Sequence, residues 1–414
     1  MKRCLMAATA LAVSGGAFAA APAAADDHAG EGFQLKIGGF YNALAIVRDQ
    51  DDPVNGTTEN SDFVVNGVTK GNIRNYDFNQ RGRYIIQGSQ TLDNGLELGF
   101  ESQHEITNSF STDRAYVYAS GGFGRVHFGA DRSAMYRLYE WTPTAGWGVD
   151  FTGHDDGVAS LNGLKYPTSA PYIANNELML TYITPRFSGI QAGVSFAPDT
   201  GPRAQAGSDQ RFITDTTALG NTTFENIIEA GLNFSQSFDG FDLGWSGGFG
   251  TARLAQEHPT IDDRRRYLYS TALNVGFGGF DIGASYKFDT HGSSGDVIGN
   301  NIRTSGYSGG INDAGYGWGM KNIHNVNAGI TYTAGPWTVG PSFGWTKESA
   351  GYEREVRYVD MGARYALAPG ADLVGSIKYV DYDAGDLGKN IPNADESDFS
   401  GDGFAGMFGI QLNF

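Results

Sequence analysis

The segment "GMFGIQLNF" (residues 406–414) decides the fold, because apolar side chains alternate in it with small or polar ones. Counted from Phe404, every second residue is apolar or glycine, and the series ends on Phe414. Alternation with a period of two predicts a β-strand with one apolar face. Chain ends usually fray unless something ties them down. A terminal strand of this kind must therefore be held by a neighbouring strand.

The same pattern recurs along the chain, in segments of about ten residues separated by turns or polar loops. Sixteen segments are predicted as strands, and the last would pair with the first to close the sheet. They are residues 33–48, 74–92, 95–106, 113–120, 124–130, 176–187, 189–197, 224–238, 241–254, 264–277, 280–290, 322–333, 337–348, 354–367, 371–383 and 404–414.

The connections alternate between short turns and longer polar loops. Short Gly, Pro, Asp or Asn turns join every second pair of strands, as hairpins require. The long connections are residues 49–73, 131–175, 198–223, 291–321 and 384–403. An even number of antiparallel strands with short turns on one rim and long loops on the other is typical of a transmembrane β-barrel. We therefore predict an all-β fold, a 16-stranded antiparallel barrel.

A soluble β-sandwich or propeller is the alternative, since its strands would also alternate. Aromatic residues at the strand ends favour the barrel, because aromatic girdles mark the two membrane interfaces. These residues are Phe40, Tyr41, Phe277, Phe280, Trp337, Tyr365, Phe404 and Phe414.

The alternation also assigns side chains to the two faces of the wall. In "NYDFNQRGRYIIQGSQ" (75–90), Tyr76, Phe78 and Tyr84 fall on one face and Arg81 and Arg83 on the other. An arginine that faces lipid at mid-membrane costs about 2–4 kcal/mol. Arg81 and Arg83 are therefore expected to face a water-filled lumen.

The N-terminal segment has the layout of a secretory signal peptide. Lys2 and Arg3 precede an apolar stretch, and small residues follow it. We predict a signal peptide over residues 1–25, cleaved after Ala25, and a barrel domain over residues 26–414; the alternative is an uncleaved anchor helix. Cys4, the only cysteine, lies inside this segment.

The charge of the chain excludes one class of partner. Without Lys2 and Arg3, 27 basic residues face 46 acidic ones, a net charge of −19. Nucleic acid is excluded as a partner because no basic surface is available to neutralise phosphates. The acids either favour cations in the pore or lie on outer loops that divalent cations bridge to lipopolysaccharide.

Three stretches resemble the general porins of Gram-negative bacteria, those of the alphaproteobacterial type in particular. They are "DRAYVYASGGFGRVHFGADRSAMY" (113–136), "ELMLTYITPRFSGIQAGVSFAP" (177–198) and the strand that ends in Phe414. The resemblance implies a water-filled barrel in the outer membrane that assembles as a homotrimer, with the third external loop folded into the pore. It also implies that Phe414 is an interface anchor and a signal for the barrel assembly machinery.

The third loop would be residues 131–175, with Trp141, Trp147 and Phe151 available to fix it to the wall. In the family that this chain resembles, acids on this loop face a basic cluster on the wall. The acidic side would consist of Glu140, Asp150, Asp155 and Asp156. The basic side would consist of Arg81, Arg83, Arg125 and, as a weaker candidate, Lys36.

The predicted function is passive diffusion of ions and small hydrophilic solutes across the outer membrane, selected by size and charge at this constriction. Alternatives are a channel specific for a sugar or an anion and, less favoured, a barrel enzyme. The sequence contains no H-E-x-x-H, G-x-S-x-G or P-loop motif. We therefore expect no enzymatic activity.

No cofactor is predicted. The stretch "NADESDFSGDGF" (393–404) is rich in oxygen ligands but lacks EF-hand spacing. Its acids, Asp395, Glu396, Asp398 and Asp402, are either weak candidates for a structural calcium site or part of a solvated loop.

Overall fold

The computed structural model describes most of the chain from residue 32 onward. The described residues are 32–50, 75–107, 112–147, 170–200, 224–254, 265–290, 322–348, 353, 355–383, 385 and 401–414. The predicted signal peptide lies outside them, as does the middle of the predicted third loop.

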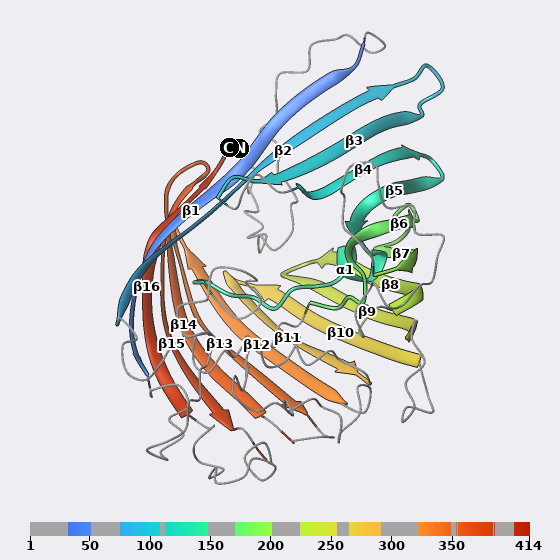
Figure 1. Cartoon of the computed structure of the whole chain (residues 1–414). Coiled ribbons are helices and arrows are strands. Elements are labelled where there is room, and N and C mark those ends of the chain that lie inside the picture. Colours follow the sequence, from blue (N-terminus) through green and yellow to red (C-terminus); the bar gives the residue numbers. More distant parts are fainter. Residues whose placement is uncertain are drawn as a thin grey trace.

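Sixteen antiparallel strands form one closed barrel, as predicted. Each strand pairs with its neighbours in sequence, and β1 pairs with β16 to close the ring (Figure 1). The strands are β1 (Gln34–Gln50), β2 (Tyr76–Thr91), β3 (Glu97–Glu105), β4 (Thr112–Gly121), β5 (Gly124–Arg132), β6 (Asn175–Ile183), β7 (Ile190–Asp199), β8 (Phe224–Phe238), β9 (Phe241–Leu254), β10 (Arg265–Phe277), β11 (Phe280–Asp289), β12 (Ile323–Ala334), β13 (Trp337–Glu348), β14 (Glu355–Ala368), β15 (Ala371–Asp383) and β16 (Gly401–Asn413).

The predicted strand ends agree closely with the structure, and the largest difference is at β6. This strand ends at Ile183, whereas the sequence predicted an end near residue 187. Pro185 interrupts the strand, and the chain then turns through positive φ angles at Ser188 (47°) and Gly189 (83°). Since proline cannot donate to the ladder, it stops the strand early.

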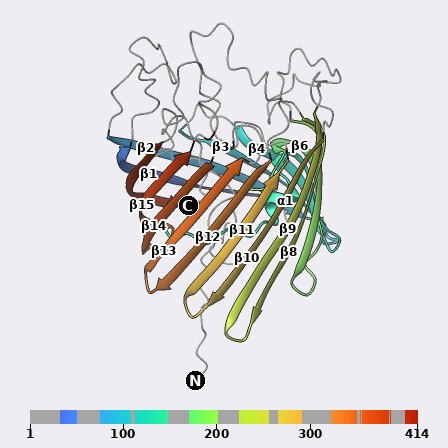
Figure 2. The same cartoon turned by 90° about the horizontal axis from the view of Figure 1, so that it is seen from below.

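Short turns join the strands on one rim of the barrel (Figure 2). They are residues 92–96, 122–123, 184–189, 239–240, 278–279, 335–336 and 369–370. Gly240 and Gly335 adopt φ angles of 90° and 58°, the left-handed conformation that two-residue hairpin turns require. The longer connections join the strands at the opposite rim.

The β1–β16 pairing holds the terminal strand identified in the sequence. It runs in register from Phe40 opposite Asn413 to Gln50 opposite Gly403. Beyond it, the amide of Gly39 donates to the carbonyl oxygen of Phe414 (2.8 Å), and the amide of Phe414 donates back to Gly39 (3.1 Å). The Phe414 ring packs edge-on against Tyr84 with a centroid separation of 6.3 Å. The chain end is therefore fixed by β1 and β2.

The two faces of the wall follow the alternation. Phe78, Tyr84, Phe408 and Phe414 are exposed on the outer face, whereas inward-facing Gln411 is buried. Each of the sixteen strands exposes at least one large apolar side chain on this outer face, which suits lipid. Among the described residues, no helix is long and apolar enough to cross a membrane.

Candidate functional site

The first limb of the third loop folds into the barrel and follows its inner wall (Figure 1). It begins with the one-turn helix α1 (Ala134–Arg137), whose N-cap is Ser133. The amide of Glu140 donates to Ser246 on β9 (2.9 Å), and Asn274 on β10 donates to the carbonyl of Trp141 (2.8 Å). Farther on, the amide of Trp147 donates to Ser376 on β15 (2.7 Å). The limb therefore passes from the β7–β9 side of the barrel to β15.

Inward-facing glycines make room for this limb. A Cβ atom on Gly231 of β8 would lie 2.8 Å from the carbonyl oxygen of Ala134. On Gly329 of β12, a Cβ would overlap the carbonyl oxygen of Pro143. Side chains at such positions would push the backbone of the loop off the wall. Gly362 likewise meets the loop backbone at Gly146, whereas Gly193, Gly244, Gly248, Gly250 and Gly283 lie against side chains of the loop.

An ion pair between partly exposed Arg137 and a buried carboxylate fixes the root of the loop to β5. Arg137 donates to both carboxylate oxygens of Asp131, with Nε–Oδ2 and Nη2–Oδ1 distances of 2.9 and 2.5 Å. His127 Nδ1 lies 2.8 Å from the same Oδ2. Burial alone would lower the pKa of Arg137, but the charge of Asp131 outweighs it and raises the pKa. The guanidinium therefore stays charged, and it covers the ring of Tyr116 at 5.1 Å.

The returning limb is fixed by a carboxylate on the opposite side of the root. Glu229 of β8 is 1% exposed and accepts hydrogen bonds from the amides of Ile173 (2.8 Å) and Ala174 (3.1 Å). Ile173 also packs with Met135 of α1 in an apolar cluster on the inner face of β6–β10. Both limbs are thus anchored at one place, where the loop leaves and rejoins the wall.

Trp147 anchors the far end of the first limb. It is 1% exposed and packs against Leu44 and Ile46 of β1, Val374 of β15 and Met407 of β16. These strands form the seam at which the barrel closes. The sequence proposed Trp147 as a residue that fixes the loop to the wall, and the structure confirms this contact.

Arg81 and Arg83 lie side by side on the inner face of β2, and carboxylates of the next two strands pair with them. Both guanidinium groups donate to Glu105 of β3, Arg81 Nη2 at 2.7 Å. Arg83 Nη1 also lies 2.9 Å from Asp113 of β4. Asp113 in turn accepts from Asn176 at the start of β6 (3.0 Å), which links this basic wall to the root of the loop.

The other predicted wall cations lie apart from this network. Arg125 stacks on the ring of Tyr118, with its Cζ atom 3.7 Å from the ring centroid. Lys36 is exposed near the start of β1, opposite Gln87 in register.

Glu140 is the one predicted loop acid among the described residues. It packs against β8 and β9, where Asn233 donates to its carboxylate (2.6 Å). Within the described chain, the acids that contact Arg81 and Arg83 are Glu105 and Asp113 of the wall itself. Asp150, Asp155 and Asp156 lie outside the described residues.

The calcium candidates are mostly outside the described residues too. Asp402 lies on β16, opposite Asp381 in register. Asp395, Glu396 and Asp398 are not described. In the described parts of the chain, no group of three or more His, Cys, Asp or Glu residues could hold a metal ion.

The wall residues that pair with the arginines or hold the loop were not predicted from the sequence. Glu105, Asp113 and Glu229 looked like ordinary polar positions of alternating strands. The sequence did contain a signal for the surface on which the loop packs, because glycines recur at inward positions from β7 to β14. An inward glycine in many successive strands indicates that another backbone approaches the wall closely.

Comparison with known proteins agrees with this architecture. A family model described as Gram-negative porin matches residues 7–385. An uncharacterised protein of Rickettsia prowazekii is 23% identical over 381 residues, which cover 77% of this chain and 80% of that protein. An uncharacterised protein of Rickettsia typhi is 22% identical over 404 residues, which cover 83% of this chain and 86% of that protein.

Among solved structures, Salmonella typhi OmpF in complex with daunomycin has a TM-score of 0.57 at 11% identity, covering 92% of this chain and 97% of that one. The anion-selective porin from Comamonas acidovorans has a TM-score of 0.53 at 15% identity, covering 92% and 100%. The trimer form of OmpT from Vibrio cholerae has a TM-score of 0.53 at 12% identity, covering 93% and 100%. At these identities the likeness concerns the fold.

Proposed function

Because the chain belongs to the Gram-negative porin family, we propose that it is a passive channel for ions and small hydrophilic solutes, narrowed by the loop that follows β5. The family and the fold indicate an outer-membrane channel. The observation that carries the proposal is the charged inner face at the level of the loop, where Arg81, Arg83, Glu105 and Asp113 meet. Such groups stay hydrated, order polar solutes and penalise apolar ones.

The same geometry supports selection by charge. The network on β2–β4 holds two guanidinium groups close to two carboxylates, so a solute that passes meets charges of both signs. We propose that loop acids complete this field from the other side. A channel of this kind forms and breaks no covalent bond, so no enzymatic activity is part of the proposal.

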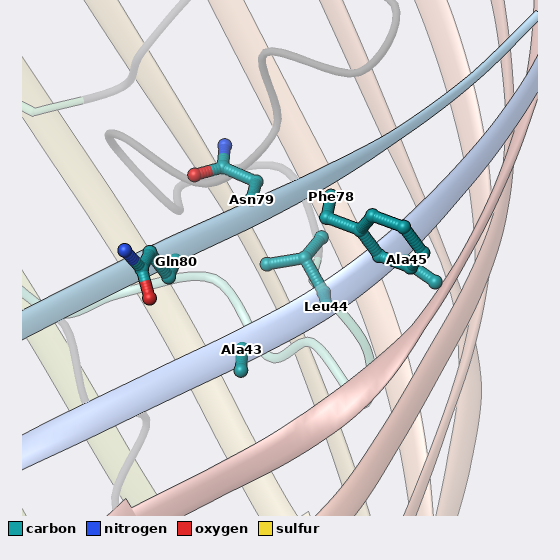
Figure 3. A pocket seen from close by; sticks show the side chains of 6 residues that line it. All are labelled: Ala43, Leu44, Ala45, Phe78, Asn79 and Gln80. Carbon is teal, nitrogen blue, oxygen red and sulfur yellow. The ribbon is translucent and has the colours of Figure 1, made fainter.

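The outer face of β1–β3 supports assembly as a homotrimer. Outward-facing Gln80 accepts a hydrogen bond from Tyr41 (2.5 Å), and Ser102 Oγ lies 2.7 Å from His104 Nε2. A hollow of about 440 Å³ adjoins Gln80 and is lined by Ala43, Leu44, Ala45, Phe78 and Asn79 (Figure 3). Polar groups are costly against hydrocarbon, so burial against another subunit suits this face. One similar structure is described as a trimer form.

The first prediction concerns conductance. Purified protein added to a planar bilayer in KCl is expected to insert as trimers. The conductance of each trimer should be the sum of three equal steps, one for each pore. Liposome swelling rates should fall smoothly with the size of neutral sugars, because the proposed pore selects by size. Saturation by one sugar would instead indicate a sugar-specific channel. Protein that runs as a folded band on an unheated gel and yet conducts no ions would contradict the proposal.

The second prediction concerns assembly. We propose that Phe414 is recognised by the barrel assembly machinery and then anchors the closed seam. Deletion of Phe414 should lower the amount of heat-modifiable protein in the outer membrane several-fold, while channels that do form keep their conductance. Phe408→Ala, which removes another exposed ring from β16, is the control. Equal insertion of the deletion variant and the parent chain would argue against this role.

A further inference from the structure

Two arginines of β5 differ from the other arginines around the loop root, because no carboxylate of a described residue pairs with them. In the described part of the chain, Arg81, Arg83 and Arg137 each contact Glu105 or Asp131. Arg125 and Arg132 instead stack on tyrosine rings, and the Nε atom of each is buried with no hydrogen-bond acceptor. Within the described residues, no ion pair neutralises the charge of either arginine.

The strand register is irregular beside Arg132, which points toward the loop. Phe128, an even-numbered residue of β5, faces outward, whereas His127 and Asp131 are buried on the inner face. Strict alternation would therefore turn Arg132 outward. The register with β6 shifts between Ala130 and Arg132, where two residue steps of β5 span three of β6. Arg132 instead meets the two limbs of the loop.

Rings from both limbs flank the Arg132 guanidinium. Its Cζ atom lies 4.6 Å from the ring centroid of Tyr136 in α1 and 5.6 Å from that of Tyr172 in the returning limb. Stacking on aromatic faces fixes the plane of a guanidinium and leaves its edge able to bind a carboxylate through two hydrogen bonds.

The aromatic cluster extends beyond these two rings. The ring centroid of Tyr136 lies 5.1 Å from that of Trp141 and 6.1 Å from that of Tyr172. The Trp141 ring is also edge-on to Tyr139, with a centroid separation of 5.1 Å. Tyr136 and Tyr139 are buried, whereas Trp141, Tyr172 and Arg132 are each partly exposed. The accessible surface of the cluster therefore combines two rings with one guanidinium.

Three nearby carboxylates have partners other than Arg132. The carboxylate of Asp131 is occupied by Arg137 and His127. The carboxylate of Glu140 accepts from Asn233 on the β8 wall. Asp113 is shared by Arg83, Arg114 and Asn176.

We propose that Arg132, Trp141 and Tyr172 form a binding subsite in the pore for small anions that carry a planar ring. The carboxylate of such a solute would pair with the guanidinium, and its ring would pack on the partly exposed aromatic faces. The subsite rests on the proposed channel function and adds a preferred class of solute to it. Neither the ion pair with the guanidinium nor the packing of the ring would be sufficient for binding alone.

The third prediction tests this subsite by current block with benzoate. In single-channel recordings in KCl, benzoate is expected to reduce the current at concentrations at which acetate and neutral benzamide do not. Arg132→Gln should raise the half-blocking concentration of benzoate about tenfold, the order expected for losing a charge-assisted pair. Trp141→Ala should weaken the benzoate block as well. Arg125→Gln, which changes the other unneutralised arginine of β5, is the matched control and should leave the block unchanged.

Several outcomes would overturn the subsite. Benzoate could block Arg132→Gln as strongly as the parent channel, or acetate could block as well as benzoate. A change in KCl conductance and noise in Arg132→Gln without a change in benzoate block would show that the arginine only braces the loop. Absence of KCl conductance from the folded parent protein would contradict the channel function itself, which distinguishes the two failures.

Discussion

Replacing both Arg81 and Arg83 with alanine is expected to make the channel markedly more selective for cations. The change removes two positive charges and leaves Glu105 and Asp113 without these partners. A unit charge about 4 Å from an ion in water contributes about 1 kcal/mol, roughly a fivefold change in local ion concentration. The ratio of potassium to chloride permeability should rise by roughly that factor, measured as the reversal potential in a KCl gradient.

Two further variants make this prediction sharper. Glu105→Gln should move the reversal potential in the opposite direction, because it removes the negative charge that pairs with Arg81 and Arg83. Arg253→Ala with Arg357→Ala removes the same number of charges from exposed positions near the long-connection rim and should have a small effect, since exposed charges are screened by salt. An unchanged reversal potential in a folded Arg81/Arg83 double variant would remove these arginines from the selectivity mechanism.

The barrel could be predicted because its signal is local. Alternation in β16 and the inward parity of Arg81 depend only on residues two apart, and the two-residue turns carry their own glycines. The path of the loop depends on contacts between distant parts of the chain. Trp147 donates to Ser376, which is 229 residues away, and no periodicity in residues 131–147 specifies that partner.

The selectivity site was only partly predictable for a related reason. Parity places Arg81 and Arg83 in the lumen, but their counter-charges depend on strand register, which sets Arg83 opposite Glu105. Arg132 does not follow the alternation of β5, since it meets the loop beside an irregularity in the strand register. The regular alternation predicts the strands of the wall, whereas strand register and departures from the alternation determine which charged groups meet inside the pore.

Trp147→Ala is expected to release the far end of the constriction loop and to weaken the barrel seam. The variant removes a buried ring from between β1, β15 and β16. Truncation of a fully buried aromatic residue costs about 3–5 kcal/mol of folding free energy. Single-channel recordings should therefore show a larger mean conductance and more current noise. The folded band on an unheated gel should disappear at a lower temperature than that of the parent protein.

Two comparisons separate loop release from a general loss of stability. Trp337→Ala removes an exposed outer tryptophan, which packs on Tyr365 at 4.7 Å, and should leave the noise unchanged. Ser376→Ala removes the acceptor of the Trp147 amide but keeps the buried ring, and it should raise the current noise less than Trp147→Ala does. A quiet Trp147→Ala channel with parental conductance would mean that the polar and glycine contacts from β8 to β14 hold the loop without the tryptophan.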